Sequence, residues 1–396
     1  MYVFIALFKK SKSFNALRNH KYAVVIAARN ESAVIAQLIK SIKKQNYPIE
    51  LLDIYVVADN CTDNTAEVAR KAGARVFERF NKQFVGKGYA LDYAFKNIIK
   101  SNTCYEGYFV FDADNLLDEN YVIEMNKVFD NGYRIITSYR NSKNYDTNWL
   151  SAGYSLWFLR EAKYLNNSRM ILNTGCAISG TGFMVSDEII RKNKGWKHHL
   201  LTEDIEFTID NALQGEKIGY CGNAVLYDEQ PYLFKQSWNQ RLRWAKGFYQ
   251  VFAKYGMELI KAIFIKRSFC CYDMFVTIMP ALFLTLVSVA VNITVFSVGL
   301  INIETYPKLM GETIGAILLS VLNSYIVLFI LGLITTITEW RNINASSVKK
   351  MKYIFSFPIF IFTYVPISIA ALFKFKKIEW QPITHSIVKT IEEIQQ

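Results

Sequence analysis

Two aspartates, Asp112 and Asp114, stand two residues apart directly after the apolar run YFVF. Carboxylate oxygens in this arrangement suit a hard divalent cation, Mg²⁺ or Mn²⁺, which is then shared with the phosphate oxygens of a ligand. Such a pair also arises often by chance in a solvated turn. Its position at the end of a predicted buried strand favours a metal site with Asp112 and Asp114 as ligands.

A second acidic pair, Glu203-Asp204, lies at the start of a helical pattern in the segment LLTEDIEFTI. Thr202 is placed to cap that helix, and acidic side chains favour a helix N-terminus, so capping alone is one explanation. The functional alternative is an ionised carboxylate that takes a proton from an acceptor hydroxyl. Asp204 is our candidate for this general base.

Two glycine-containing segments are candidates for contact with a phosphorylated ligand. Gly86-Lys87-Gly88 precedes a predicted helix and could bring backbone N–H groups and one cation near a diphosphate, although it shows no Walker pattern. Gly180-Thr181-Gly182 would allow a close approach to the backbone. The adjacent His198 and His199 cannot face one ligand together from a helix, so both are predicted to lie on the surface.

The pentapeptide QRLRW, residues 240–244, brings an amide, two arginines and an indole together. A basic anchor at a membrane surface and a site for a charged substrate would both use such residues. Basic residues between 246 and 267 do predict an amphipathic segment at the cytosolic surface. A generic anchor does not explain these particular residue types, so Gln240, Arg243 and Trp244 are assigned to the site and Arg241 to the surface.

Strands that alternate with helices are predicted to position these groups. The strands are expected at 22–28, 53–59, 74–79, 108–114 and 133–138, with helices at 34–42, 65–72 and 89–100. This alternation predicts an α/β fold with a mainly parallel sheet. Ligands of such sheets bind beyond the carboxyl ends of the strands. The polar groups found there, at 29–31, 59–60 and 112–114, are therefore expected to share one crevice.

Composition and charge limit the class of partner. Of the 396 residues, 52% are hydrophobic and 15% aromatic, which is rich for a soluble enzyme. The formal net charge of +12 suits a phosphorylated ligand or an acidic lipid surface. The basic residues form no low-complexity tail, so we expect no nucleic-acid partner. The six cysteines include no CxxC pair, as is typical of reduced thiols on the cytosolic side.

Long apolar runs predict a membrane region over residues 261–396, with two or three spanning segments at about 274–300, 313–338 and 353–373. A helix needs roughly 20 apolar residues to cross the hydrocarbon core. Basic residues after the second run and in the tail after the third favour the cytosolic side for both. Pro358 and Pro366 interrupt the third run and favour an interfacial or re-entrant segment there.

Residues 1–20 form a separate short segment. Tyr2–Phe8 is apolar but too short to span, and it lacks the basic start and cleavage site of a signal peptide. It is interpreted as the remnant of an N-terminal membrane helix or as an interfacial segment. Residues 21–260 would then form a cytosolic catalytic domain of a multi-pass protein in the plasma membrane.

The ordered set of motifs resembles the family-2 processive glycosyltransferases, which include the cellulose, chitin, hyaluronan and poly-N-acetylglucosamine synthases. The matching pieces are ARNE (28–31), VADNCTDNT (57–65), DAD (112–114), GTGFMV (180–185), TED (202–204), QRLRW (240–244) and a late WQPITH (380–385). The resemblance implies a GT-A fold, the fold of nucleotide-diphospho-sugar transferases, fused to transmembrane and interfacial helices.

The resemblance also implies roles for individual residues. Asp204 would be the general base of a single inverting displacement, and Asp114 the closer ligand of a Mg²⁺ or Mn²⁺ ion. Arg243 would face the diphosphate, and Trp244 would pack near the acceptor sugar. The other residues expected to bind substrate are Glu31, Asp59, Lys87, Asp112, Gly180, Thr181, Gly182, Glu203 and Gln240.

Three functions remain open from the sequence. The first is a membrane-bound inverting transferase that uses UDP-N-acetylglucosamine or UDP-glucose to extend a β-linked cell-surface polysaccharide, with or without processivity. The second adds one sugar to a membrane lipid. The third is a non-catalytic nucleotide-sugar-binding membrane subunit, against which the set of carboxylates argues. Because the chain is short beside the larger synthases, a homo-oligomer or an accessory export subunit would be needed to complete a polymer channel.

Overall fold

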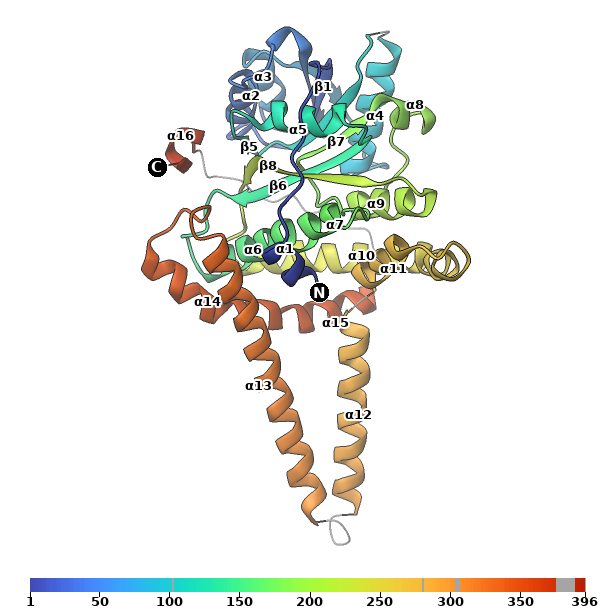
Figure 1. The fold of residues 1–396 in the computed structure, drawn as a ribbon, viewed down its shortest axis with the longest axis vertical. Helices are drawn as coiled ribbons and strands as arrows, with labels where there is room; N and C mark the ends of the chain where they lie inside the picture. The colour runs from blue at the N-terminus through green and yellow to red at the C-terminus, as the bar shows by residue number, and fades with distance from the viewer. Residues whose placement is uncertain (102, 280, 303–306, 375–388, 396) are drawn as a thin grey trace.

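The structure is a computed structural model that describes residues 1–101, 103–279, 281–302, 307–374 and 389–395. Figure 1 shows an α/β domain above a layer of helices, from which two long helices project away from the domain. The WQPITH motif and most of the basic tail predicted after the third apolar run lie outside the described residues.

The centre of the domain is an eight-stranded sheet with the order β3-β2-β1-β4-β7-β6-β8-β5. Its strands are β1 (Tyr22–Ala28), β2 (Leu52–Asp59), β3 (Arg75–Arg79), β4 (Gly107–Asp112), β5 (Leu116–Leu117), β6 (Ile135–Ser142), β7 (Phe183–Ser186) and β8 (Ile218–Asp228). β1 pairs in parallel with β2 and β4, β2 with β3, and β6 with β8, whereas β7 runs antiparallel between β4 and β6. The predicted α/β fold with a mainly parallel sheet is confirmed.

Helices cover the sheet and bury the strands on both faces. These are α2 (Ile35–Lys43), α3 (Thr65–Lys71), α4 (Lys87–Lys100), α5 (Tyr121–Asp130), α8 (Asp187–Lys192) and α9 (Glu203–Gln214). On α2 the buried side chains fall at Ile35, Leu38, Ile39 and Ile42, which is the spacing of one helical face. Strands covered in this way are apolar throughout rather than alternating, as YAVVIAA in β1 is.

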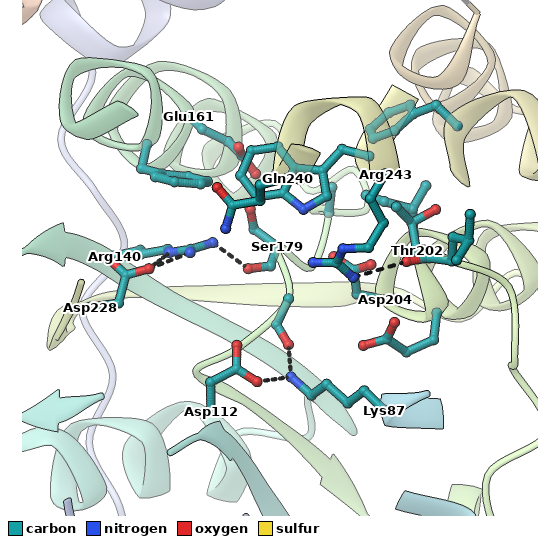
Figure 2. Close-up of a pocket in the computed structure, with 18 of the residues that line it drawn as sticks. Lys87, Asp112, Arg140, Glu161, Ser179, Thr202, Asp204, Asp228, Gln240 and Arg243 are labelled. Atoms are coloured by element: carbon teal, nitrogen blue, oxygen red, sulfur yellow. Dashed lines mark hydrogen bonds and ion pairs between the residues drawn. The ribbon is translucent and has the colours of Figure 1, made fainter. Parts of the chain in front are cut away.

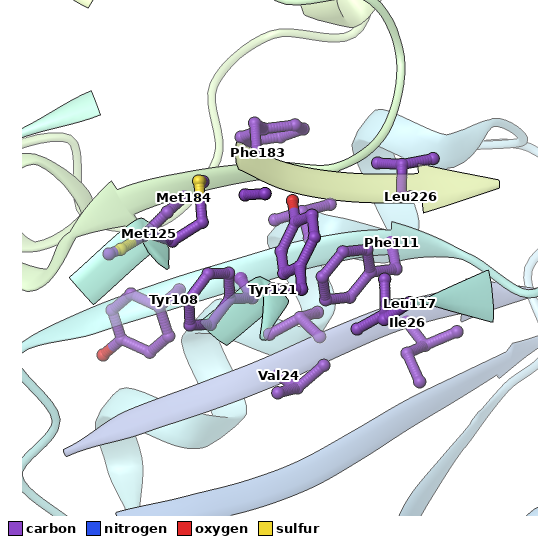
Figure 3. Close-up of a cluster of buried hydrophobic side chains, with 14 of the residues drawn as sticks. Val24, Ile26, Tyr108, Phe111, Leu117, Tyr121, Met125, Phe183, Met184 and Leu226 are labelled. Carbon is purple, nitrogen blue, oxygen red and sulfur yellow. The ribbon is translucent and has the colours of Figure 1, made fainter. Parts of the chain in front are cut away.

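The core under α5 connects strands from β1 to β8 across the sheet. Figure 3 shows Val24 of β1, Phe111 of β4 and Tyr121 of α5 gathered with Phe183 and Leu226 from β7 and β8. The hydroxyl of buried Tyr121 donates to Ser138 Oγ at 2.9 Å, so its polar atom is satisfied inside an apolar cluster. The packing fixes the short antiparallel strand β7 beside β4, directly behind the predicted crevice.

A continuous helical stretch follows β6 and lies beneath the sheet. It consists of α6 (Trp149–Arg160), a π-helix (Glu161–Asn166) and α7 (Asn167–Ile171). Asn148 caps it, since its side chain accepts hydrogen bonds from the backbone N–H groups of Leu150 and Ser151. α1 (Tyr2–Phe8) packs against the π-helix and α7, and Ser168 Oγ donates to Tyr2 O at 2.8 Å. The sequence patterns predicted none of this stretch.

The remaining helices form the base of the domain and the projecting pair. α10 (Phe234–Ile265), α11 (Phe269–Ile278), α14 (Ser347–Phe362) and α15 (Tyr364–Lys374) lie across the base, α12 (Ala281–Ile301) and α13 (Pro307–Thr338) project from it, and α16 (Ile391–Gln395) lies beside the domain (Figure 1). Two segments, Gly311–Thr338 and Ser347–Phe373, are long and apolar enough to cross a membrane. The apolar run that begins at Met274 is divided between α11 and α12, because Met274 and Ile278 are buried in the domain.

Candidate active site

A cavity of about 580 Å³ opens where the carboxyl ends of β1, β2 and β4 meet α9 and α10. The predicted site residues that line it are Glu31, Asp59, Lys87, Asp112, Asp114, Gly180, Glu203, Asp204, Gln240, Arg243 and Trp244. Their chain positions run from 31 to 244, so the fold brings together groups that are distant in the sequence. The three polar strand ends do share one crevice.

Lys87 supplies a fixed cation on one wall of this cavity. Its Nζ donates to Asp112 Oδ1 at 2.5 Å and to the carbonyl oxygen of Gly180 at 2.7 Å (Figure 2). Burial lowers the pKa of Lys87, but the carboxylates around it, Asp112 first and then Glu203 and Asp204, raise it above its ordinary value. The side chain therefore stays protonated at the edge where a diphosphate would lie.

The aspartates of the DAD motif stand in a carboxylate-rich corner. Asp114 is buried and its Oδ2 accepts from the backbone N–H of Glu229 at 3.0 Å. Asp228, at the end of β8, pairs with Arg140 Nε at 2.7 Å. Burial raises the pKa of Asp228 to about 6, with Asp114 and Asp112 adding to the rise against the effect of Arg140. The carboxylates of Asp112 and Asp114 thus repel other negative charge at this corner.

This corner fits a Mg²⁺ or Mn²⁺ ion in its chemistry. The donors are hard carboxylate oxygens, and a divalent cation would relieve the repulsion that raises the pKa of Asp228. Across the described ranges, no three His, Cys, Asp or Glu side chains converge closely enough to hold an ion by themselves. Mg²⁺ commonly keeps several waters and binds one or two carboxylates plus substrate phosphates, so two carboxylates such as those of Asp112 and Asp114 would be enough to hold it.

Thr181 and Gly182 do not line the cavity, in contrast to their predicted place in the substrate site. Thr181 is buried, and its Oγ1 accepts from the backbone N–H of Asp112 at 2.9 Å. Gly182 has a φ of +66° and its N–H donates to Val110 O at 3.0 Å. Both residues hold the end of β4, and with it Asp112, against β7.

Replacing Gly182 by Ala is expected to destabilise the fold strongly. A Cβ there would lie 1.8 Å from Leu226 Cδ2, at a backbone conformation that L-residues rarely adopt. We expect a loss of about 3 kcal/mol in the free energy of unfolding. Gly132→Ala is the matched control, because Gly132 also has a positive φ, +91°, but no atom within 4 Å of its Cβ position. Urea unfolding of the two variants in detergent should separate them; equal losses would contradict the packing role of Gly182.

Glu203 and Asp204 occupy the first turn of α9 and face the cavity. Burial raises the pKa of Glu203 to about 7, and the neighbouring Asp204 adds to the rise. Burial also raises the pKa of Asp204, while the backbone N–H of Ile205 and the charge of Lys87 oppose the rise. Thr202 is at the N-cap position as predicted, but its side chain makes no capping hydrogen bond.

Gly180 lets the backbone pass between two charged side chains of the site. A Cβ on Gly180 would lie 3.9 Å from both Asp204 Oδ2 and Arg140 Nη1. Its φ of +79° is also one that favours glycine. The carboxylate of Asp204 is therefore held close to the Ser179–Gly180 backbone, with open cavity in front of it (Figure 2).

The loop that precedes α9 is anchored from behind. The buried carboxylate of Glu206 accepts from the backbone N–H groups of His199 and Leu200 and pairs with Lys254 Nζ at 2.6 Å. His198 is 1% exposed and lies 3.0 Å from Asp210 Oδ2 through its Nε2, so its predicted surface position is wrong. His199 is half-buried and stacks on Tyr89. The two histidine side chains contact different partners, Asp210 and Tyr89.

Helix α10 delivers the QRLRW segment to the cavity. Arg243 Nη1 donates to Leu201 O at 3.4 Å, and Figure 2 shows the Gln240 side chain between Arg140 and Arg243. Gln240 Oε1 is buried without a hydrogen-bond partner within the described ranges. Trp244 packs edge-on against Tyr154, with ring centroids 5.7 Å apart. An amide and a guanidinium thus face the cavity from one turn of helix.

Arg241 is fully buried, which corrects its predicted surface position. Its Nη1 donates to Thr363 Oγ1 at 2.5 Å and to Phe360 O at 3.2 Å. Its guanidinium also lies 4.7 Å from the ring centroid of Phe360 and 5.0 Å from that of Tyr364. The side chain joins α10, which carries the site, to α14 and α15.

Several residues that line the cavity, or that contact its lining from behind as Arg79 does, were not predicted from the sequence. Arg79 pairs with the buried Asp59 at 2.5 Å, and Arg140 donates from its Nη1 to Ser179 O at 2.8 Å. Arg140 and Asp228 lie near the ends of β6 and β8, where the rule of strand ends would have pointed to them. Strand β6 was expected to end at Ser138, four residues before its observed end, and β8 was not predicted.

Comparison with known proteins identifies the family. Residues 20–247 match the family model described as glycosyltransferase-like family 2, which is more than half of the chain. The chain belongs to glycosyltransferase family 2. The predicted family and the predicted enzyme class, a hexosyltransferase, are thereby confirmed.

Curated relatives extend this assignment. The chain is 27% identical over 277 residues to the probable glycosyltransferase YdaM of Bacillus subtilis (strain 168), covering 64% of this chain and 61% of that protein. It is 27% identical over 251 residues to a β-monoglucosyldiacylglycerol synthase of Nostoc sp., covering 60% and 51%. It is 24% identical over 264 residues to a poly-β-1,6-N-acetyl-D-glucosamine synthase of Staphylococcus epidermidis, covering 64% and 63%. The chain spans less than two thirds of each of these relatives.

A solved structure bears on the fold. A mannosyltransferase from Pyrobaculum calidifontis, in complex with GDP-Man and Mn²⁺, superposes with a TM-score of 0.50 at 17% identity, covering 80% of this chain and 92% of that one. With the family match, this likeness confirms the predicted GT-A fold.

Proposed function

We propose that this glycosyltransferase moves a hexose from UDP-N-acetylglucosamine or UDP-glucose to an acceptor hydroxyl at a membrane, with inversion at the anomeric carbon. One observation carries the proposal: the carboxylate of Asp204 and the cations of Lys87 and Arg243 line a single cavity. An inverting transfer needs a base on the side of the acceptor and positive charge on the side of the departing diphosphate.

The reaction follows from these positions. Asp204 takes the proton of the acceptor hydroxyl while the oxygen of that hydroxyl forms a bond to the anomeric carbon. The bond from that carbon to the diphosphate oxygen breaks in the same step, and UDP leaves. Lys87 and Arg243 stabilise the negative charge that develops on the diphosphate. A single displacement of this kind converts an α-linked donor into a β-linked product.

The donor and metal assignments complete the proposal. Asp112 and Asp114 would hold Mg²⁺ or Mn²⁺, which supplies further positive charge to the diphosphate. Asp59, fixed by its ion pair with Arg79, and Glu31 would lie beside the nucleoside. Gln240 has an unpartnered buried oxygen that can accept from a sugar or ribose hydroxyl. Trp244 offers an apolar ring to the acceptor.

Removing divalent metal with EDTA is expected to lower the rate of UDP release by at least about tenfold, because the leaving diphosphate then loses charge stabilisation. Adding Mg²⁺ or Mn²⁺ should restore the rate. Asp112→Asn should raise the metal concentration needed for half-maximal activity, whereas Asp53→Asn, an aspartate of β2 outside the cavity, should not. An enzyme fully active in EDTA would contradict the metal role of Asp112 and Asp114.

The membrane part of the proposal rests on α12 and α13, which project from the base and would insert into the bilayer (Figure 1). α14 and α15 run crosswise to them under the domain, which suits an interfacial position. Trp244 and Arg243 belong to α10, which packs against α15. The cavity would then sit at the cytosolic surface of the plasma membrane, within reach of a lipid acceptor.

Extension of a β-linked polysaccharide is the second candidate, and the match to a poly-β-1,6-N-acetyl-D-glucosamine synthase favours it. The two helices that project in the described part of the chain cannot by themselves enclose a channel, so this candidate calls for further segments, such as those of a second copy or an accessory subunit. Addition of one sugar to a membrane lipid needs no channel. The match to a β-monoglucosyldiacylglycerol synthase supports that choice of acceptor.

A donor screen tests the proposed function. The purified chain is incubated with membranes and each labelled UDP-sugar, and UDP release and the size and organic solubility of labelled product are measured. An organic-soluble product with one sugar supports lipid glycosylation, and a high-molecular-weight product supports polymer extension. Nucleotide-sugar binding without hydrolysis or transfer would instead support a non-catalytic subunit.

A further inference from the structure

The cavity continues beyond the donor site into a second half, which we call the acceptor half. The helical stretch that carries Trp157, Arg160, Leu165 and Arg169 lines it. Tyr2 of α1 and residues of α11, among them Val276, line it as well, and Arg169 joins them through its ion pair with Asp273. Asp204, the proposed base, lines the same cavity, so a molecule in the acceptor half could reach it.

The π-helix in this wall keeps one face turned toward the cavity. Trp157, Glu161, Leu165 and Arg169 all line it, four residues apart. In a regular α-helix each step of four residues would rotate the side chain by about 40° away from the previous one. The wider turn of the π-helix Glu161–Asn166 counters this drift. π-helical turns are rare and frequently lie at functional sites, so the wall has the character of a binding surface.

Arg160 differs from the other guanidinium groups in and around this half. Arg169 Nε pairs with Asp273 Oδ2 at 2.6 Å, and Arg140 pairs with Asp228. Arg160 instead lies over the Trp157 ring, 4.3 Å from its centroid, and its buried Nε has no hydrogen-bond partner in the part of the chain that the structure describes. The Arg160 side chain as a whole is half-buried, but a buried N–H donor without an acceptor is costly unless an anion meets it.

Glu161 is a favourable charge for Arg160, but among the described residues nothing accepts a hydrogen bond from the buried Arg160 Nε. Ser179 supplies a side-chain hydrogen bond to the Glu161 carboxyl group, and Arg140 is its strongest favourable charge. Burial raises the pKa of Glu161, and the charges of Arg140 and Arg160 oppose the rise. The Glu161 carboxyl group beside Ser179 can hydrogen-bond an acceptor hydroxyl on its way to Asp204.

The rim of the acceptor half is apolar and exposed. Val276 both lines the cavity and is 47% exposed, so it stands at an opening. Other apolar side chains are exposed on the two helices that supply Val276 and Tyr2 to the cavity: Tyr272 and Phe269 on α11, and Phe4 and Phe8 on α1. α11 leads directly to α12, the first of the projecting helices. Apolar chains, rather than a soluble saccharide, match this rim.

We propose that the acceptor half binds a membrane lipid whose head group carries both a phosphate and a free hydroxyl. Arg160 pairs with the phosphate, Glu161 orients the hydroxyl, and Leu165 and Val276 contact the acyl chains. This inference rests on the proposed transferase function and names the acceptor class of the same site. The cavity alone would also admit a neutral lipid, so the role of Arg160 is what the experiment must decide.

The test uses the full chain in phosphatidylcholine nanodiscs with a labelled UDP-sugar and either phosphatidylglycerol, which is anionic, or diacylglycerol, which is neutral. The wild-type protein should glycosylate phosphatidylglycerol with the higher kcat/KM. Arg160→Gln should raise the KM for phosphatidylglycerol about tenfold or more, and Arg160→Lys should recover part of the loss. Arg70→Gln, at an exposed arginine of α3, is the matched control. Donor hydrolysis without acceptor should be the same in Arg70→Gln as in the wild-type protein.

A second variant protects the test against misfolding. Leu165→Trp would fill the acceptor half while keeping Arg160, and it should abolish transfer without weakening the binding of UDP measured by titration calorimetry. An unchanged KM in Arg160→Gln, a preference for diacylglycerol, or a soluble saccharide as the acceptor would each overturn the inference. If the wild-type protein neither hydrolyses nor transfers from any nucleotide sugar, the proposed function itself fails.

Discussion

Replacing Asp204 by Asn is expected to lower kcat for sugar transfer by about 10²- to 10⁴-fold, the usual contribution of a general base. Asparagine keeps the shape of the side chain and a hydrogen-bond acceptor but cannot take the proton of the acceptor hydroxyl. Because Lys87, Asp112 and Arg243 remain in place, the affinity for UDP should change little. UDP release with saturating acceptor measures the first effect, and titration calorimetry with UDP measures the second.

Two further variants sharpen the result for Asp204. Glu67→Gln removes another first-turn carboxylate, on the exposed end of α3, and should leave kcat unchanged. Glu203→Gln should lower kcat, but by less than Asp204→Asn does. Glu203 shares the first turn of α9 with Asp204, and the two carboxyl groups raise the cost of ionising each other. Full activity in Asp204→Asn would exclude this residue as the base.

Replacing Arg241 by Ala is expected to lower the free energy of unfolding by about 3 kcal/mol. The substitution removes the hydrogen bonds to Thr363 Oγ1 and Phe360 O and the contacts with two aromatic rings, all inside a buried seam. α10 would then be held less firmly against α14 and α15. Because Gln240 and Arg243 flank Arg241 on α10, sugar transfer should fall as well. Thermal unfolding in detergent and UDP release measure the two effects.

Lys235→Ala is the control for Arg241, because Lys235 is an exposed cation on the same helix. It should change the free energy of unfolding by less than about 0.5 kcal/mol. Thr363→Val removes the same hydrogen bond from the other side. The loss in the free energy of unfolding in the double variant should therefore be smaller than the sum of the two single losses. A stability of Arg241→Ala equal to that of Lys235→Ala would contradict the buried seam.

The part of the site at the strand ends could be predicted because its geometry is general. Parallel strands place their carboxyl ends at one edge, so the groups after β1, β2 and β4 had to meet wherever these strands paired. The order of motifs also assigned Asp204 and Arg243 to one substrate site. These predictions do not depend on a contact between particular side chains.

The buried position of Arg241 could not be predicted from local sequence. Its partners Phe360 and Thr363 lie 119 and 122 residues further along the chain, in a segment that hydropathy marks only as apolar. In isolation an arginine in a basic stretch before a membrane region is more often exposed. Only the packing of α10 on α14 and α15 decides otherwise.

The acceptor half escaped prediction for a different reason. The stretch 149–171 contains twelve residues of α-helix, then a π-helix, then a short α-helix, so its pattern follows no single period. β7 has only four residues and pairs antiparallel inside a parallel sheet, which alternation of strands and helices does not anticipate. Both features matter to the site, since β7 supports Asp112 and the π-helix lines the cavity.

The most direct test of the account is the configuration of the new glycosidic bond. A UDP-sugar labelled with ¹³C at the anomeric carbon is supplied to the enzyme, and the product is examined by NMR. We expect a β linkage from the α-linked donor, since a single displacement with Asp204 as the base inverts the anomeric carbon. An α-linked product would mean retention, and it would contradict the assignment of Asp204 as the base of a single inverting step.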